Sequence, residues 1–205
     1  MRWWDIEPVL GLERELFPDD AWSRGLFWSE LAHARGPNAT RRYIVAETYG
    51  GCGEEARGES AYGRRADGES GVEPGESAVS AAGRTIVGYG GLAAVDRTGD
   101  IQTIAAARAY WGTGLGARLL GDLLAGANDF ECREVLLEVR VDNTRAQRLY
   151  ERFGFEPIGL RPNYYQPGNV DAVVMRRVEH DADDEHGGTG HGSMDEHEQG
   201  MTNDG

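Results

Sequence analysis

The sequence predicts an α/β fold in a single domain, with a central sheet of mixed strand direction flanked by helices. Helix-like and strand-like patterns follow one another in the order α-α-β-β-β-α-β-α-β-β, which is typical of this class. The chain has 205 residues and is 40% hydrophobic, which suits one domain with its own core. No run of about eighteen apolar residues occurs, so no membrane-spanning helix is expected.

The first two elements are helices. Apolar residues at helical spacing predict the first helix, and these are Ile6, Val9, Leu10 and Leu16. A cap at Asp19 or Asp20 is expected to start the second helix. The apolar positions of that second helix are Trp22, Leu26, Phe27 and Leu31.

The remaining elements form the sheet and its two later helices. Strand-like stretches rich in β-branched and aromatic residues predict the strands, and the first four are 41–47, 84–95, 99–107 and 133–141. A helix of about twelve residues is expected after the glycine-rich loop at 112–116. A second helix over 143–154 is expected to end at Gly154, and 155–178 is expected to form two strands joined by a loop.

Two segments are predicted to be disordered, which leaves 1–178 as the folded domain. Residues 50–83 hold nine glycines and no Leu, Ile, Phe, Met or Trp, and they are interpreted as a loop insertion between two strands. The tail 179–205 is rich in acids, Gly and His. Its four histidines are spaced at six, five and six residues, which matches no compact metal site, so no metal is expected. A metal-binding tail is the alternative interpretation.

Charge and cysteine usage restrict the function class further. The net charge is −14, but the two disordered segments contribute −4 and −9, so the rest is nearly neutral. No nucleic-acid surface is therefore expected. Cys52 and Cys132 are interpreted as isolated reduced thiols. The N-terminus "MRWWDIEP" lacks the apolar core of a signal peptide, so a cytoplasmic location is expected.

The stretch "YWGTGLGARLLGDLL" places glycines at Gly112, Gly114 and Gly116, between a strand and a helix. Such a loop exposes successive backbone N–H groups beside the positive end of the helix, a combination that binds phosphate. The stretch lacks the Lys-Ser/Thr ending of a nucleoside-triphosphate loop and the GxGxxG spacing of dinucleotide folds. A tight strand-to-helix turn explains these glycines equally well.

Two motifs carry a resemblance to a known family. The stretch "IQTIAAARAYWGTGLGARLL" resembles the coenzyme A signature of the GNAT acetyltransferases, Q/R-x-x-G-x-G/A. The stretch "LEVRVDNTRAQRLYERFGF" is similar to their second signature, N-x-x-A-x-x-L-Y-x-x-x-G-F. The likeness covers about 3–178 apart from 50–83. It is greatest to the RimI-type members, through "LFPDDAWSRGLFWSEL", "LLEVRVDN" and "RPNYYQPGNVDAVVM".

The resemblance implies a GNAT fold in which two splayed strands hold acetyl-coenzyme A. The cofactor-binding residues that it implies are Ile104, Ala105, Ala106, Gly112, Thr113, Gly114, Leu115, Gly116, Ala117 and Asn143. For Asn143 a helix N-cap is the alternative role. Trp111 stands where the family has Gln or Arg beside the cofactor pyrophosphate, and it is expected to pack against the helix or the cofactor.

The same resemblance assigns catalytic roles to two residues. Glu138 is implied as the general base that takes a proton from the acceptor amine. The alternative is an ordinary exposed strand position beside Arg140. Tyr150 is implied as the acid that protonates the leaving thiolate, and the alternative is a core aromatic on the face of its helix.

The acceptor implied by the resemblance is a protein or peptide N-terminus, the N-terminal alanine of a small-subunit ribosomal protein. Residues expected near the acceptor are Arg161, Tyr164, Tyr165 and Asp171. A hairpin rich in tyrosines is the alternative for that stretch. Two other functions are kept open: a GNAT enzyme acting on a small-molecule amine or a lysine side chain, and a non-catalytic acyl-coenzyme A-binding module.

Overall fold

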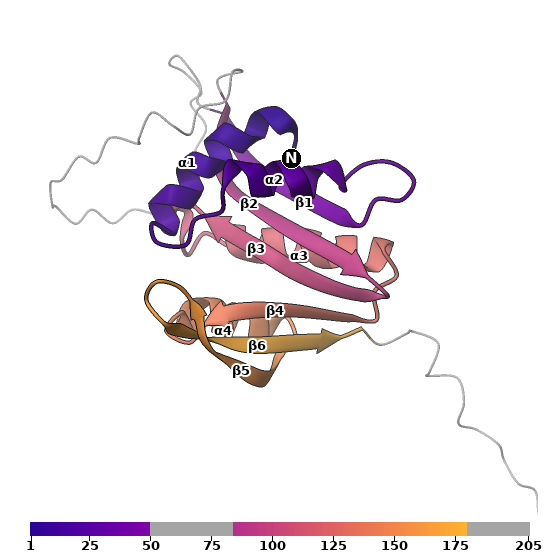
Figure 1. Ribbon diagram of the computed structural model, residues 1–205, viewed down its shortest axis with the longest axis vertical. Helices are drawn as coiled ribbons and strands as arrows, with labels where there is room; N and C mark the ends of the chain where they lie inside the picture. Colours follow the sequence, from indigo (N-terminus) through magenta and orange to yellow (C-terminus); the bar gives the residue numbers. More distant parts are fainter. Residues whose placement is uncertain (50–83, 180–205) are drawn as a thin grey trace, which may run out of the picture.

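A computed structural model describes residues 1–49 and 84–179 (Figure 1). The predicted insertion 50–83, the tail from residue 180 onward, Cys52 and the four tail histidines lie outside the described residues. The domain boundaries therefore stay a prediction. Cys132 is a free and buried cysteine. In the described ranges, no helix has both the length and the apolar character needed to cross a membrane.

Six strands form one mixed sheet in the order β1-β2-β3-β4-β6-β5, which confirms the predicted α/β class. Neighbouring strands pair antiparallel except β3 and β4, which pair parallel. The strands are β1 Arg41–Tyr49, β2 Arg84–Val95, β3 Thr98–Ala106, β4 Glu134–Arg140, β5 Glu156–Tyr165 and β6 Val170–Val178.

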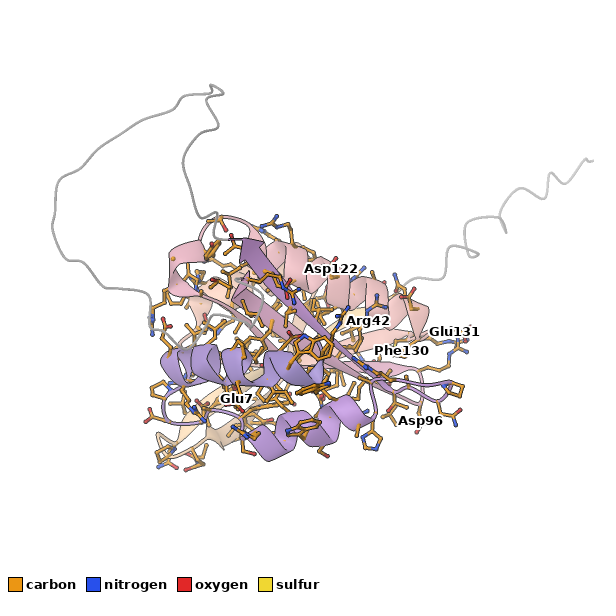
Figure 2. All side chains as sticks on the ribbon, turned by 90° about the horizontal axis from the view of Figure 1, so that it is seen from above. Glu7, Arg42, Asp96, Asp122, Phe130 and Glu131 are labelled. Carbon is orange, nitrogen blue, oxygen red and sulfur yellow. The ribbon has the colours of Figure 1, made fainter. Side chains whose placement is uncertain are left out.

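Helices cover both faces of the sheet (Figures 1 and 2). On one face lies α1, preceded by the short 3-10 turn η1, together with α2; on the other lie α3 and α4. A second turn, η3, leads from β3 towards α3. The helical bounds are η1 Trp3–Asp5, α1 Ile6–Leu16, α2 Arg24–Ala32, η3 Arg108–Tyr110, α3 Leu115–Asp129 and α4 Thr144–Arg152.

The predicted cap of α2 at Asp19 or Asp20 is wrong, because α2 begins one turn later. Ser23 is the cap, and its Oγ accepts a hydrogen bond from Leu26 N at 3.2 Å. Trp22 lies before the helix, where its backbone N–H donates to Glu13 Oε1 at 3.0 Å. The connection between α1 and α2 is thus tied to a buried carboxylate of α1.

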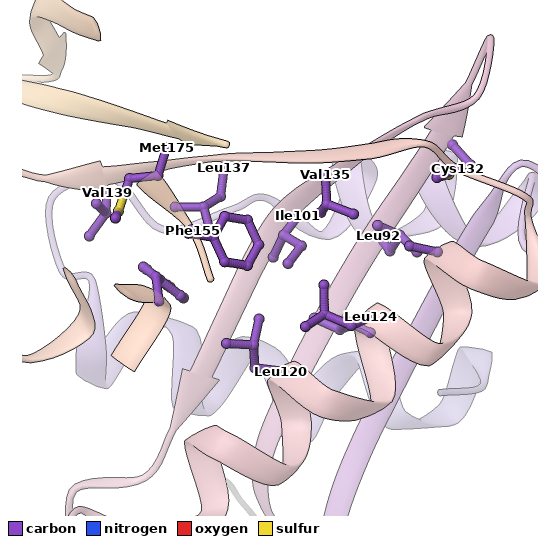
Figure 3. Packing of buried hydrophobic residues seen from close by; sticks show 14 residues of the cluster. Leu92, Ile101, Leu120, Leu124, Cys132, Val135, Leu137, Val139, Phe155 and Met175 are labelled. Atoms are coloured by element: carbon purple, nitrogen blue, oxygen red, sulfur yellow. The ribbon is translucent and has the colours of Figure 1, made fainter. Parts of the chain in front are cut away.

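The main core lies between the sheet and α3 (Figure 3). Leu120 and Leu124 from α3 meet Ile101 of β3 and Leu137 of β4 there. Glycines in β2 allow α3 to approach closely, since a Cβ at Gly88 would lie 2.9 Å from Leu119 Cδ1. A second cluster joins α1 and α2 to the opposite face, so each layer has its own hydrophobic contact with the sheet.

The two strands at the centre of the sheet separate part of the way along. Pairing between β3 and β4 runs from Thr98↔Glu134 to Ile101↔Leu137. Beyond that point β3 still pairs with β2, and β4 still pairs with β6. Within the described residues, the facing edges of 102–106 and 138–140 therefore have no strand partner. These two facing, unpaired strand edges are called the slot here.

Candidate active site

The glycine loop lies at the end of β3 that borders this slot. Gly112 and Gly114 have φ values of +79° and +86°, a left-handed conformation that favours glycine. Gly114 is the N-cap of α3, and the first N–H bonded within the turn is that of Arg118, to Gly114 O at 3.1 Å. The N–H groups of residues 115–117 precede that bond and are therefore available to an anion.

The other predicted loop residues have more local roles. Thr113 Oγ1 donates to Tyr110 O at 2.8 Å, which closes the turn. A Cβ at Gly116 would lie 3.4 Å from Leu149 Cδ2, so this glycine lets α3 pass close to α4. Leu115 is buried in a small cluster with Leu119, whereas Ala117 is half-buried.

Along β3, the predicted cofactor residues contribute their backbone to the slot. The Ala105 side chain is buried among residues of α1 and β2. Ile104 and Ala106 pack against the cluster that contains Leu115. Their side chains are thus used in packing, and the edge of this strand offers N–H and carbonyl groups to a ligand with an extended polar arm.

Asn143 occupies the N-cap of α4. Its side-chain oxygen accepts a hydrogen bond from Ala146 N at 3.1 Å. The residue is exposed, so its amide nitrogen stays accessible. The helix-cap role is therefore present in the structure, and the cofactor contact stays a prediction.

Trp111 packs at the junction of the loop with α4. Its indole Nε1 donates to Ala106 O at 2.8 Å. The Arg145 guanidinium carbon lies 3.7 Å from the ring centroid and that of Arg108 lies 5.1 Å from it. The residue is 42% exposed. The residue that departs from the family pattern therefore gathers two cations beside the glycine loop.

Glu138 is the first residue of β4 beyond the last pairing partner of β3. Val135, Leu137 and Val139 point into the main core, so Glu138 points to the opposite face. Its side chain is 18% exposed, and its Oε1 lies 3.1 Å from Arg161 Nη1 of β5. The structure thus brings together the predicted base and one of the residues predicted to lie near the acceptor.

Tyr150 lies on α4 with its ring in the main core, 5.9 Å from the Phe155 ring centroid. The residue is 6% exposed. Burial is the one cause that raises the pKa of its hydroxyl above the ordinary tyrosine value. The group is therefore protonated at neutral pH and has a proton to donate.

The end of β5 and the start of β6 bring further polar groups near Glu138. Tyr165 Oη donates to the backbone carbonyl of Glu138 at 3.3 Å. Burial first, and then the nearby hydroxyls of Tyr164 and Tyr150, raise the pKa of Tyr165. Asp171 Oδ1 accepts a hydrogen bond from Asn163 N at 2.8 Å, so its carboxylate ties the start of β6 to the end of β5.

The structure adds Asp100, which the sequence analysis did not single out. It lies on β3 and alternates with Ile101, a core residue, so it points to the same face as Glu138. Burial and the charge of Glu138 raise its pKa to about 6, against the opposing effect of Arg161. The polar alternation in "GDIQT" was the available signal, but the proximity to Glu138 depends on the strand order.

Comparison with known proteins points to one family of enzymes. The family model described as "Acetyltransferase (GNAT) family" matches residues 38–155. N-alpha-acetyltransferase RimI of Mycobacterium tuberculosis is 43% identical over 99 residues, which are 46% of this chain and 61% of that protein. A ribosomal protein bS18-alanine N-acetyltransferase of Haemophilus influenzae is 36% identical over 93 residues, which are 44% of this chain and 63% of that protein.

These matches span about three fifths of the length of either relative. Among solved structures, Ard1 from Thermoplasma volcanium superposes with a TM-score of 0.61 at 21% identity, covering 88% of this chain and 95% of that one. That likeness extends over both halves of the sheet and concerns the fold. The family match covers more than half of the chain, including the glycine loop and Tyr150. The chain therefore belongs to the GNAT family of acetyltransferases.

Proposed function

We propose that this protein transfers an acetyl group from acetyl-coenzyme A to the α-amino group of a protein N-terminus. The observation that carries the proposal is the position of Glu138, a half-buried carboxylate at the point where β3 and β4 part. The glycine loop lies at the far end of the same slot. A proton acceptor and an anion cradle thus border one opening between two strands.

The residues present fit acetyl-coenzyme A, which supplies an activated thioester. The edges of 102–106 and 138–140 have no strand partner, so they offer backbone groups to an extended arm that carries amides. The carbonyls of Ala106, Glu138 and Arg140 already accept side-chain hydrogen bonds, which leaves the other groups of these edges for the arm. A Cβ on Gly112 or Gly114 would meet no atom within 4 Å, so the loop is open on its outer side. The N–H groups of residues 115–117 suit a diphosphate. The residues that would hold the cofactor are those predicted from β3 and the loop, with Asn143 at the start of α4.

The transfer requires one proton to leave the amine and one to reach the leaving thiolate, and residues of this protein serve both steps. A peptide α-amino group has a pKa of about 8, so much of it is protonated near neutral pH. Glu138 accepts that proton, directly or through a water molecule, and the Arg161 guanidinium holds the carboxylate in place. Tyr150 keeps its hydroxyl proton because burial raises its pKa, and this is the proton available to a departing thiolate.

The acceptor class is supported by the face on which Glu138 lies. Asp100 and Glu138 bring negative charge to this face, which favours a cationic N-terminus. The two relatives named above are N-terminal acetyltransferases by their names, one of them for the alanine of ribosomal protein bS18. We therefore infer the N-terminal alanine of a small-subunit ribosomal protein as the acceptor, with a cytoplasmic location to match.

The test uses the full chain, acetyl-coenzyme A and a six-residue peptide that begins Ala-Arg and contains one lysine, with the peptide mass followed over time. We expect the gain of one acetyl group, and no gain when the α-amine is blocked. Acetylation of the blocked peptide at a lysine would instead support the side-chain alternative. No transfer to any amine, with coenzyme A still bound, would support a non-catalytic binding module.

A further inference from the structure

Trp111 connects the two sides of the slot entrance. Its Nε1–H donates to the carbonyl of Ala106, the last residue of β3, at 2.8 Å. Its ring lies 3.7 Å from the guanidinium carbon of Arg145, in the first turn of α4. The helix α4 follows β4 in the chain. The Trp111 side chain therefore contacts both the end of β3 and the helix that follows β4, one on each side of the slot.

The contact leaves Arg145 free to bind an anion. A guanidinium that lies against an aromatic ring uses its flat face, while its five N–H groups point outward in the plane. Arg145 is exposed and forms no ion pair with any residue in 1–49 or 84–179. Arg108 lies beside the same ring, but its Nε is 4.0 Å from Glu15 Oε1, so the Glu15 carboxylate partly neutralises its charge.

We propose that Arg145, held against the Trp111 ring, binds a phosphate group of coenzyme A, and that Trp111 is its positioning residue. This inference rests on the proposed function. The same entrance holds the N–H groups of residues 115–117, so a phosphate there meets a guanidinium and backbone donors together. A cation on α4 and a loop at the end of β3 thus contact one ligand from the two sides of the slot.

The first test is the affinity of the full chain for coenzyme A and for dephospho-coenzyme A, measured by titration calorimetry without acetyl transfer. Arg145→Gln is expected to raise the Kd about 10- to 100-fold, as expected for the loss of charge-assisted hydrogen bonds. Arg148→Gln is the matched control, because Arg148 is also exposed on α4 and has no assigned role. Circular dichroism confirms that each variant folds.

The two ligands show which phosphate Arg145 binds. A loss seen with coenzyme A alone identifies the 3′-phosphate, and an equal loss with both ligands identifies the diphosphate; either result supports the proposal. If Arg145→Gln binds both ligands as Arg148→Gln does, the proposal is overturned. If the unmodified chain binds neither ligand, the proposed function itself fails, and this inference fails with it.

The second test concerns Trp111. Trp111→Ala is expected to weaken binding, and Trp111→Phe, which keeps a ring face, is expected to restore part of the affinity. If Trp111 acts through Arg145, the double variant Trp111→Ala/Arg145→Gln binds no more weakly than Arg145→Gln alone. Full additivity of the two losses would show that Trp111 does not position Arg145.

Discussion

Glu138 is one of several acidic residues on β4 and its surroundings, but its position at the parting of two strands sets it apart. Glu134 lies on the same strand and the same face, where β3 and β4 are still paired, and its side chain contacts Thr98 and Arg176. The two glutamates thus lie on the same strand and face, and differ mainly in that Glu138 borders the slot and Glu134 does not. This makes Glu134 a matched control for Glu138.

We expect Glu138→Gln to lower kcat/KM for the peptide by about 10²- to 10⁴-fold, because the amide keeps the shape but accepts no proton. The affinity for coenzyme A should stay unchanged. Steady-state kinetics and titration calorimetry measure the two quantities. Glu134→Gln should retain its rate, and an equal loss in both variants would mean that the effect of Glu138 is structural.

Asp100 gives a pH-dependent prediction for stability. Its pKa of about 6 in the folded protein exceeds its ordinary value of 3.8. The folded state therefore binds more protons than the unfolded state between these values, and stability falls as pH rises through this window. Above about pH 6 the full penalty is present, and below about pH 4 it is absent.

Asp100→Asn removes this penalty. Denaturant unfolding should show the variant about 1–2 kcal/mol more stable than the unmodified protein at pH 8, a value reduced to allow for solvent screening of a partly exposed group. At pH 3.5 the difference should vanish. Asp122→Asn, on the outer side of α3 (Figure 2), should give no such pH-dependent gain. A gain for Asp100→Asn that is equal at both pH values would contradict this account.

The start of α3 requires a left-handed backbone conformation at Gly114, whereas the space around a side chain there is not limiting. Gly114→Ala should destabilise the protein by about 1–2 kcal/mol, because alanine disfavours the left-handed conformation. Gly121 lies inside the same helix with nothing within 4 Å of an added Cβ. Gly121→Ala should therefore stabilise the protein by about 0.5–1 kcal/mol.

Urea unfolding of both glycine variants measures these differences. Coenzyme A binding should weaken in Gly114→Ala and stay unchanged in Gly121→Ala. Similar stability changes in the two variants would show that the φ of +86° at Gly114 does not restrain the loop.

Local patterns were sufficient to predict most elements and insufficient for their contacts. The strands were predicted within one or two residues for β3 and β4, and the stop at Gly154 is confirmed by its φ of +83°. The start of α2 was wrong because Asp19, Asp20 and Ser23 all suit an N-cap, and the choice depends on how Trp22 packs and on its bond to Glu13.

For the candidate site as well, local patterns predicted the residues but not their neighbours in space. Glu138 and Tyr150 were predicted from two motifs, but the partner of Glu138 is Arg161, on a strand two places away in the sheet. Asp100 comes close only because β3 and β4 pair in parallel over four residues. A residue's neighbours on other strands depend on the sheet order, which no local pattern contains.

For the molecule as a whole, the slot separates two groups of strands that share four paired positions. A ligand that pairs with both edges would join them. We expect hydrogen exchange of 102–106 and 138–140 to slow when coenzyme A is added, because open amides gain partners. Strand β5, at the outer edge of the sheet, is the internal control. Uniform slowing across the chain would indicate general stabilisation instead.

The pairing of β1 with β2 has a practical consequence. Tyr49 and Arg84 are the last partners of this hairpin, and an ion pair from Arg84 Nη1 to Glu47 Oε2 at 2.8 Å fastens the same end. The two chain ends that flank residues 50–83 are therefore neighbours, and closure entropy changes slowly with the length of what joins them. A fluorescent reporter domain grafted between these positions would leave every strand contact intact. Gly88, four residues after Arg84, pairs with Ala106 at the end of β3. The grafted domain would therefore lie near the glycine loop, where its fluorescence could report the binding of coenzyme A.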